Sequence, residues 1–376
     1  MANNRPRHLP TAGAVPDGTF APRYIYLDAV DKADCFPYQE KEPHRHDAIW
    51  KTLYKLQYAN GDVIGYMLDS TLEKLLELPE SLRGEVIVDK AERTVRAFEQ
   101  PTEEERNKTV AAVMAHWRQN KTFDVLRGWR DELWPVYCRQ GSSSSSSSSD
   151  LTHEEREKQP VRVAYSVERS ATGMLGVTRY GVHMTGYVAD PSAPHGMRIW
   201  VPRRAADKST YPGMLDNTVA GGLMTGEDPF ECIVREANEE ASLPEDLMRQ
   251  RAKYAGMVTY IYITDERAGG ESGQIYPETQ WVYDVELPPD FRPQPNDGEV
   301  ADFTLMTVDE VREELARGHF KPNCGLVIVD FFVRHGIITR ENEPDYDEIV
   351  ERMHRYLPFP GPHSAYNASR AKAERP

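Results

Sequence analysis

The chain has 376 residues, which is more than one average domain and long enough to bury two cores. Its formal net charge of −15 argues against a nucleic-acid surface, because binding to a phosphate backbone needs clustered Lys and Arg. The apolar runs are too short for a membrane span, and the N-terminus lacks the layout of a signal peptide. We therefore expect a cytoplasmic protein, with organellar targeting left open.

The four cysteines are scattered along the chain, without the CxxC or Cys/His spacing of a zinc site. Neither structural zinc nor a disulfide framework is predicted. This cysteine usage fits a reducing compartment.

Composition divides the chain into five segments. Residues 1–22 are polar and rich in Pro, Arg, Asn and Gly, which predicts a disordered N-terminus. Residues 23–140 predict a smaller α+β domain, and the serine run inside 141–160 is typical of a linker. Residues 161–340 predict the larger domain, and 341–376 predict a C-terminal helix followed by a loose tail.

Two local signals mark the first domain. The apolar runs 53–56 and 63–67 flank an Asn-Gly pair at 60–61, which predicts a hairpin. Thr102 and Glu105 form a capping box at the start of a helix. The aromatic-rich stretch that follows this helix is interpreted as core packing.

The larger domain predicts an α/β fold in which a sheet is sandwiched between helix layers. The expected strands are 180–188, 198–202, 257–263, 280–287 and 303–306, and the expected helices are 229–241, 308–317 and 325–335. The first of these helices carries the most informative pattern in the chain.

Helix 229–241 has a well-defined start. Asp228 is a favourable N-cap, Pro229 suits the first helical position, and Glu231 occupies the third, as in a capping box. At about 100° per residue, an apolar stripe faces one side of the helix. This stripe consists of Phe230, Ile233, Val234, Ala237 and Ala241.

Beside the apolar stripe, Glu236, Glu239 and Glu240 lie together at i, i+3 and i+4. Like charges at this spacing weaken a helix by about 0.2–0.5 kcal/mol per pair. A solvated helix face is the plain alternative for such a cluster. A hard cation such as Mg²⁺, which prefers carboxylate and phosphate oxygens, would neutralise it.

The spacing of charged residues from Gly221 to Glu240 favours a bound cation over a solvated helix face. The pattern is Gly221, five residues, Glu227, seven residues, Arg235-Glu236, an apolar residue, Asn238 and Glu239-Glu240. It resembles the Nudix box, the signature of hydrolases that cleave diphosphates linked to another group. Ser242 departs from the general pattern, because most Nudix boxes have a glycine there. That glycine normally supplies a left-handed C-cap, so a serine costs on the order of 1 kcal/mol.

The flanking segments 200–222, 241–244 and 295–300 resemble the thiamine-pyrophosphokinase-related subgroup, in which an N-terminal domain precedes the Nudix domain. The resemblance implies a Nudix-type α/β/α sandwich around a mixed sheet, and Mg²⁺ as the cofactor with Mn²⁺ as an alternative ion. It implies cleavage of thiamine diphosphate, or an oxidised form, to the monophosphate and phosphate. Another nucleoside diphosphate derivative as substrate, and a non-catalytic ligand-sensing module, stay open. We expect no nucleic-acid or membrane partner, and the oligomeric state is open.

The resemblance also assigns roles in the box. The metal ligands are Glu236, Glu240 and Glu239. A backbone carbonyl of Gly221 or Gly222 can complete the coordination, since a residue without a side chain permits close approach.

The remaining catalytic candidates surround these ligands. Arg235 orients the catalytic carboxylates, and Glu227 reaches the water or a second metal. The general base is open between Glu239 and Glu299, because Nudix enzymes place this residue either in the helix or on a later loop. Glu299 ends an Asp-Gly-Glu turn, where glycine permits a sharp bend.

Basic residues ahead of the box are candidate substrate ligands. Arg203, Arg204 and Lys208 are predicted to bind the diphosphate, because arginine matches phosphate oxygens bidentately. Solvated edge residues are the alternative interpretation.

The approach to the glycine pair is expected to shape the pocket for the organic part of the substrate, through Asp216, Asn217 and Tyr211. A cationic thiazolium ring favours an aromatic face and a nearby carboxylate, which Tyr211 and Asp216 could supply. For Trp200 and Trp281, apolar packing is the better interpretation.

Overall fold

The computed structural model describes residues 25–140, 155 and 157–364. The segment 1–22 predicted to be disordered, the serine run at 141–149 and the end of the C-terminal tail lie outside the described residues. Within the described ranges, no helix is both long and apolar enough to cross a bilayer.

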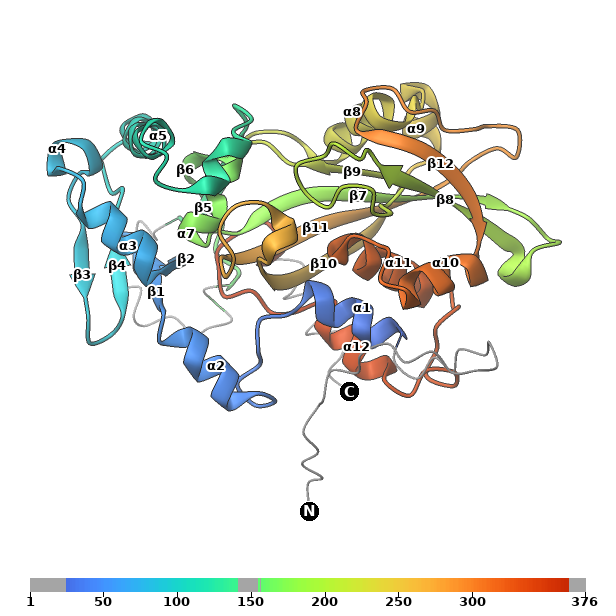
Figure 1. The fold of residues 1–376 in the computed structure, drawn as a ribbon, viewed down its shortest axis with the longest axis horizontal. Helices are drawn as coiled ribbons and strands as arrows, with labels where there is room; N and C mark the ends of the chain where they lie inside the picture. Colours follow the sequence, from blue (N-terminus) through green and yellow to red (C-terminus); the bar gives the residue numbers. More distant parts are fainter. Residues whose placement is uncertain (1–24, 141–154, 156, 365–376) are drawn as a thin grey trace, which may run out of the picture.

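A six-stranded mixed sheet lies at the centre of the molecule (Figure 1). Its strand order is β10-β11-β7-β8-β12, and β9 pairs with β7. β11 runs parallel to β7, and the other pairs are antiparallel. The strands are β7 (Arg179–Ala189), β8 (Met197–Arg204), β9 (Val219–Gly222), β10 (Lys253–Ile263), β11 (Ile275–Glu286) and β12 (Val300–Thr307). The five predicted strands are confirmed, whereas β9, in which two of four residues are glycine, had no strand signal.

Helices cover both faces of this sheet (Figure 1). One face carries α8 (Pro229–Ala241) and α9 (Glu245–Arg251). The other carries α1 (Ile25–Ala33), α10 (Val308–Ala316), α11 (Pro322–Arg334) and α12 (Tyr346–Arg352). A separate apolar core fills the space on each side. The predicted α/β/α sandwich is confirmed.

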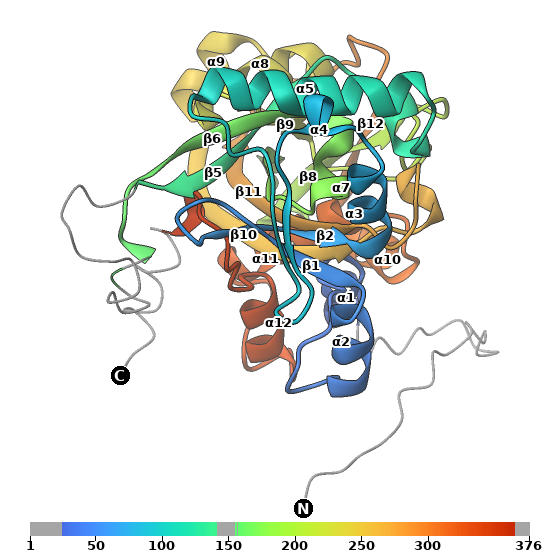
Figure 2. The same ribbon diagram turned by 90° about the vertical axis from the view of Figure 1, so that its left-hand side faces the viewer.

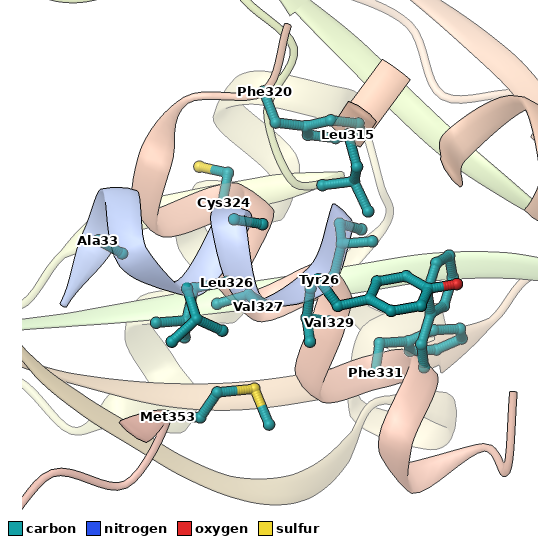
Figure 3. Close-up of a cluster of buried hydrophobic side chains, with 14 of the residues drawn as sticks. Tyr26, Ala33, Leu315, Phe320, Cys324, Leu326, Val327, Val329, Phe331 and Met353 are labelled. Carbon is teal, nitrogen blue, oxygen red and sulfur yellow. The ribbon is translucent and has the colours of Figure 1, made fainter. Parts of the chain in front are cut away.

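Helix α1 is the first element of the described chain, yet it packs into the core that it shares with α10, α11 and α12. Its Tyr26 ring (Figure 3) meets Phe332 of α11 edge-on, with ring centroids 6.2 Å apart. Beyond the helix, the buried Asp34 carboxylate accepts hydrogen bonds from Arg352 at 3.3 Å and Arg355 at 2.9 Å. The start of the segment expected to form the N-terminal domain is thus tied to α12, near the C-terminal end of the described residues.

The N-terminal part contains a four-stranded sheet of order β2-β1-β4-β3 (Figure 2). Its elements are α2 (Pro43–Trp50), β1 (Leu53–Gln57), β2 (Val63–Leu68), α3 (Asp69–Leu76), α4 (Glu80–Arg83), β3 (Ile87–Asp89), β4 (Thr94–Arg96) and α5 (Glu103–Gln119). The predicted hairpin is confirmed by the antiparallel pairing of β1 with β2. The predicted capping box is confirmed at the start of α5, where Thr102 and Glu105 bond reciprocally.

A two-stranded ribbon joins the two parts of the molecule. It pairs β5 (Leu133–Arg139) with β6 (Val161–Glu168) in antiparallel register. Short helices flank the ribbon: η1 (Asp124–Gly128) before it, and η3 (Arg169–Ala171) with α7 (Thr172–Leu175) after it. The Leu133 carbonyl accepts a hydrogen bond from the N–H of Thr225, and the Ser166 hydroxyl lies 2.9 Å from the Thr225 hydroxyl. The ribbon therefore holds the loop that leads into α8.

Candidate active site

Helix α8 begins and ends largely as its sequence predicts. The Asp228 carboxylate caps it by accepting hydrogen bonds from two N–H groups of the first turn, at 2.9 and 3.2 Å. Glu231 pairs with Arg249 at 2.6 Å and does not close a capping box. At the other end, Ser242 adopts the left-handed conformation with a φ of 53°, and its hydroxyl donates to the Gln294 carbonyl. The predicted N-cap and the implied left-handed C-cap are confirmed.

Arg235 is the centre of an ion-pair network on this helix. It pairs with Glu227 at 2.9 Å, with Glu236 at 3.0 Å and with Glu239 at 2.9 Å. Glu227 also accepts a hydrogen bond from the N–H of Met224. The network fixes the loop ahead of α8 and turns Glu239 toward the arginine.

Glu236 and Glu240 occupy surroundings that disfavour negative charge. Burial raises the pKa of Glu236 to about 7 against the opposing charge of Arg235. Burial also holds the pKa of Glu240 well above its ordinary value, and the charge of Glu236 adds to this effect. The N–H of Ala220 donates to Glu240 at 3.1 Å. A cation beside these two carboxylates would relieve their mutual repulsion.

The glycine pair at the end of β9 leaves room for the groups around it. A Cβ at Gly221 would overlap the carboxylate of Glu236. A Cβ at Gly222 would overlap the indole ring of Trp134 from β5. The first glycine therefore lets a carboxylate approach the backbone, and the second lets the ribbon pack against the site.

This donor set fits a hard divalent cation. Mg²⁺ is usually bound through one or two carboxylates and completes its shell with water and substrate phosphates. Glu236 and Glu240 supply two carboxylates beside Gly221. In the described part of the chain, no three His, Cys, Asp or Glu side chains form a metal-binding group. Glu239 is held by Arg235, so its role as a third ligand stays a prediction.

A cavity of about 770 Å³ opens onto these carboxylates. Its wall combines α8, β7, β9 and the loop after β8 with η1 and β5 from the N-terminal part. The volume lies in the range of small-molecule sites, which is about 300–1,000 Å³. The cations on the wall are Arg127, Arg130, Arg169, Arg179, Arg204, Lys208, Arg235 and Lys321. The same wall carries carboxylates, so its cations lie among at least as many acidic side chains: Asp124, Glu132, Asp216, Glu236, Glu239, Glu240, Glu278, Asp297 and Glu299.

Strand β8 ends in two arginines whose side chains lie in different surroundings, because successive side chains on a strand point to opposite faces of the sheet. Arg204 lines the cavity and pairs with Asp216 at 2.7 Å. Arg203 lies outside the cavity wall and donates to the Gly213 carbonyl at 2.9 Å. Burial favours a raised pKa for Asp216, but the charges of Lys321 and Arg204 outweigh it and lower the pKa.

Lys208 and Glu299 form an ion pair on the cavity wall. Glu299 closes the predicted turn, in which the Asp297 carboxylate accepts its N–H at 2.8 Å. Burial raises the pKa of Glu299, but the hydrogen bond from Lys208 outweighs it. The charges of Arg130 and Arg169 lower the pKa further, below its ordinary value. Glu299 is therefore ionised at neutral pH, as a proton acceptor must be.

Another section of the wall is aromatic. The rings on the wall come from Trp134, Tyr180, Tyr211, Tyr260, Tyr262 and Tyr276. The Arg179 guanidinium lies 5.0 Å from the ring of Trp134 and 4.5 Å from that of Tyr276. Arg179 also pairs with the buried Glu278 at 3.1 Å. This section therefore combines planar rings with a carboxylate that already pairs with Arg179.

His183 is a residue of the wall that sequence reasoning missed. Its Nδ1 lies 2.7 Å from Oδ1 of Asn217, and its Nε2 lies 3.5 Å from Nδ2 of Asn323. Burial lowers the pKa of His183 to about 4. A neutral ring can donate to Asn217 and accept from Asn323. No sequence signal marks this group, because the fold alone brings its three members together.

Most of the predicted site residues meet at this one cavity. Those on its wall are Tyr211, Arg204, Lys208, Asp216, Gly221, Gly222, Arg235, Glu236, Glu239, Glu240 and Glu299. Arg203, Asn217 and Glu227 lie outside the wall, and the last two support residues on it. Trp200 and Trp281 pack in the core under α8, as interpreted from the sequence.

Comparison with known proteins matches both parts of the chain. Residues 186–324 match the NUDIX domain, and residues 52–145 match a domain of unknown function, DUF4743. The uncharacterized protein YJR142W of Saccharomyces cerevisiae is 34% identical over 342 residues, which cover 90% of this chain and 92% of the yeast protein. Nudix hydrolase 20, chloroplastic, of Arabidopsis thaliana is 38% identical over 230 residues, which cover 61% of this chain and 53% of the plant protein. Nudix hydrolase 24, chloroplastic, of the same plant is 34% identical over 251 residues, which cover 66% of this chain and 60% of the plant protein.

Carboxylates on a helix beside a cavity rich in cations suit the cleavage of phosphoanhydrides, and the Nudix match spans that helix. The protein is an enzyme of the pyrophosphohydrolase class. Residues 186–324 therefore form a Nudix domain, and the chain has Nudix hydrolase homologues.

Proposed function

We propose that the chain hydrolyses thiamine diphosphate, or an oxidised form of it, to the monophosphate and phosphate. One observation carries this proposal: a single cavity joins the carboxylates of α8 to an aromatic section that holds the buried Glu278. The diphosphate would lie at the first and the organic ring at the second. A cationic thiazolium ring favours an aromatic face with a nearby carboxylate. The similarity of the segments that flank the Nudix box to the thiamine-pyrophosphokinase-related subgroup supports the narrow choice of substrate.

The cofactor we propose is Mg²⁺, with Mn²⁺ as an alternative ion. Glu236 and Glu240 would hold it, with Glu239 and a carbonyl of Gly221 or Gly222 as the further predicted ligands. When bound, the ion neutralises charge on the phosphate oxygens. Arg235 would keep the carboxylates of α8 in place through its three ion pairs.

Hydrolysis also needs a proton acceptor. As water forms its bond to phosphorus and the anhydride P–O bond breaks, the proton of the water passes to a carboxylate of the chain. Glu239 and Glu299 both line the cavity and both can take this role. Removal of a general base typically costs about 10²- to 10⁴-fold in rate. Turnover and Mg²⁺ affinity of Glu239→Gln and Glu299→Gln, measured singly, identify the base as the variant that shows this loss in kcat while it keeps its affinity for Mg²⁺.

A substrate panel tests the proposed reaction. Full-length protein with Mg²⁺ is offered intact and oxidised thiamine diphosphates, nucleoside diphosphate sugars, dinucleotides and deoxynucleoside triphosphates. We expect the highest kcat/KM for a thiamine-type diphosphate, with release of one phosphate. Preference for another nucleoside diphosphate derivative would replace the substrate. Ligand binding without any turnover would indicate a ligand-sensing module.

The organisation and location of the protein stay as proposals. The chain would comprise an N-terminal domain at 23–140 and a Nudix domain at 161–340. A cytoplasmic location remains our prediction, and the chloroplastic names of the two plant relatives keep an organellar location open.

A further inference from the structure

Arg130 is a cation without a carboxylate partner in a cavity where most cations have one. Ion pairs occupy Arg127, Arg169, Arg179, Arg204, Lys208 and Arg235. Among the described residues, Arg130 and Lys321 are the wall cations with no carboxylate within salt-bridge distance. The charge of Lys321 acts on the buried Asp216. Arg130, which is exposed, is the one of these two cations that belongs to the N-terminal part of the chain.

The backbone that carries Arg130 is anchored. Its N–H donates to the Glu168 carboxylate at 2.9 Å. Two residues further along, the Glu132 carbonyl accepts the N–H of Arg169 at 2.9 Å. The turn before β5 is thus tied to the end of β6. Because the backbone is held, the arginine loses less freedom on binding a ligand than it would on a free loop.

Residues before and after this turn also contact the Nudix domain. On one side, the Glu271 carboxylate of the β10–β11 loop accepts the N–H of Asp124 at 2.5 Å and of Val125 at 3.1 Å. On the other side, Trp134 packs where Gly222 has no side chain. Through Trp134, the N-terminal part thus contacts Gly222. The residue before it, Gly221, lies beside Glu236. Arg130 therefore faces the same cavity as the carboxylates of α8.

The local charge balance favours an anion next to this arginine. The charges of Arg130, Arg169 and Lys208 all act on Glu299. Lys208 already donates to Glu299, and Arg169 is held by Glu132 at 3.0 Å. With these two ion pairs formed, Arg130 is the one of the three cations without a carboxylate partner among the described residues. A phosphate group bound here would neutralise the charge of Arg130.

We propose that Arg130 binds a phosphate group of the diphosphate substrate, so that the N-terminal part of the chain completes the substrate site of the Nudix domain. The inference rests on the proposed function, because it assigns a binding residue to one phosphate group of the proposed substrate. A guanidinium presents parallel N–H donors that match two phosphate oxygens. Arg130 lies in the segment matching DUF4743, outside residues 186–324. That segment would then take part in selecting the substrate.

Calorimetry with inorganic pyrophosphate tests this subsite directly on the full chain in the presence of Mg²⁺. We expect Arg130→Gln to weaken pyrophosphate binding on the order of 10- to 100-fold, as for a lost charge-assisted hydrogen bond. The matched control is Arg127→Gln, because Arg127 lies on the same wall but already pairs with Asp124 at 2.7 Å. This control should keep the affinity of the wild type. Arg130→Lys, which retains charge without the fork, should fall between them.

Kinetics and stability complete the test. With the preferred organic diphosphate, Arg130→Gln should raise KM with a smaller change in kcat, and its thermal midpoint should match the wild type. Equal pyrophosphate affinity and equal KM in wild type and Arg130→Gln would overturn the proposal, as would the absence of pyrophosphate binding by the wild type. An Arg130-dependent affinity without turnover of any diphosphate would uphold the subsite and reject the proposed function.

Discussion

Helix α8 and the wall formed by η1 and β5 face the same cavity, yet they arise in opposite ways. In α8, the cap, the apolar stripe and the glutamates lie within one short stretch of sequence. The wall depends on contacts between distant segments, such as the bond from the N–H of Asp124 to Glu271, 147 residues away. The comparison indicates that the chemistry of the site is encoded locally, whereas the shape of its substrate pocket depends on long-range docking.

Removal of a carboxylate from α8 should have the largest effect. Glu240→Gln keeps an acceptor for the N–H of Ala220 but removes a charge that would face the metal. We expect kcat/KM to fall by about 10²- to 10⁴-fold, since metal stabilisation of the reacting phosphate is worth several kcal/mol. The fold should persist, because the variant also removes repulsion from Glu236. Steady-state kinetics with a far-UV spectrum measure both quantities, and wild-type turnover would refute the assignment.

Filling the space at Gly222 should separate the ribbon from the site. Gly222→Ala places a methyl group against Trp134, and overpacking of this kind typically costs about 1–3 kcal/mol. Urea unfolding measures the loss. The control is Gly128→Ala on the same wall, where an added Cβ meets no atom within 4 Å and stability should change by less than about 0.5 kcal/mol. Equal stability of the two variants would contradict the packing described for β5 and β9.

Acid should destabilise the protein through a histidine far from α8 in sequence. Burial lowers the pKa of His363 to about 4 from its ordinary value of 6.5, and the charge of Arg139 acts in the same direction. The unfolded chain therefore binds the proton first, so this stability is present above pH 6.5 and is lost as the pH falls toward 4. The loss from this group between pH 7 and pH 5 is about 2 kcal/mol. His363→Leu should show a shallower pH dependence in urea unfolding, and an unchanged slope would reject the buried neutral state.

The smallest expected effect concerns the start of α8. Asp228→Ala removes a side chain that accepts two N–H groups, and loss of such an N-cap typically costs about 1 kcal/mol. Asp228→Asn should recover most of this stability, because asparagine is an equally good N-cap. Thermal unfolding of the three proteins checks the order, and an unaffected alanine variant would mean that the helix start is held by packing alone.

Sequence reasoning succeeded where a pattern repeats within one element. It predicted five of the six strands of the central sheet, the bounds of α8 and the capping box at Thr102, because period, caps and turn residues are local features. It treated Arg203 and Arg204 as one pair of ligands, although alternation along β8 directs only Arg204 to the cavity. Because side chains alternate along a strand, only one of two successive arginines at its end can face the cavity.

Other parts of the site carry no local signal. Arg130, Trp134 and His183 reach the cavity through docking between segments, and no periodicity in the sequence reports such contacts. Helix α1 is a similar case, since its apolar stripe indicates burial without identifying α11 as its partner. Packing between distant segments decides these positions, so the structure was needed to find them.

In our proposal, α8 and the N-terminal part bind opposite ends of one diphosphate. A crystal structure of the full chain with Mg²⁺ and methylene diphosphonate, which cannot be hydrolysed between its phosphorus atoms, would show both contacts at once. We expect an ion bound by Glu236 and Glu240 and a phosphonate oxygen hydrogen-bonded to Arg130. An ion bound elsewhere, or a diphosphonate out of reach of both groups, would contradict it.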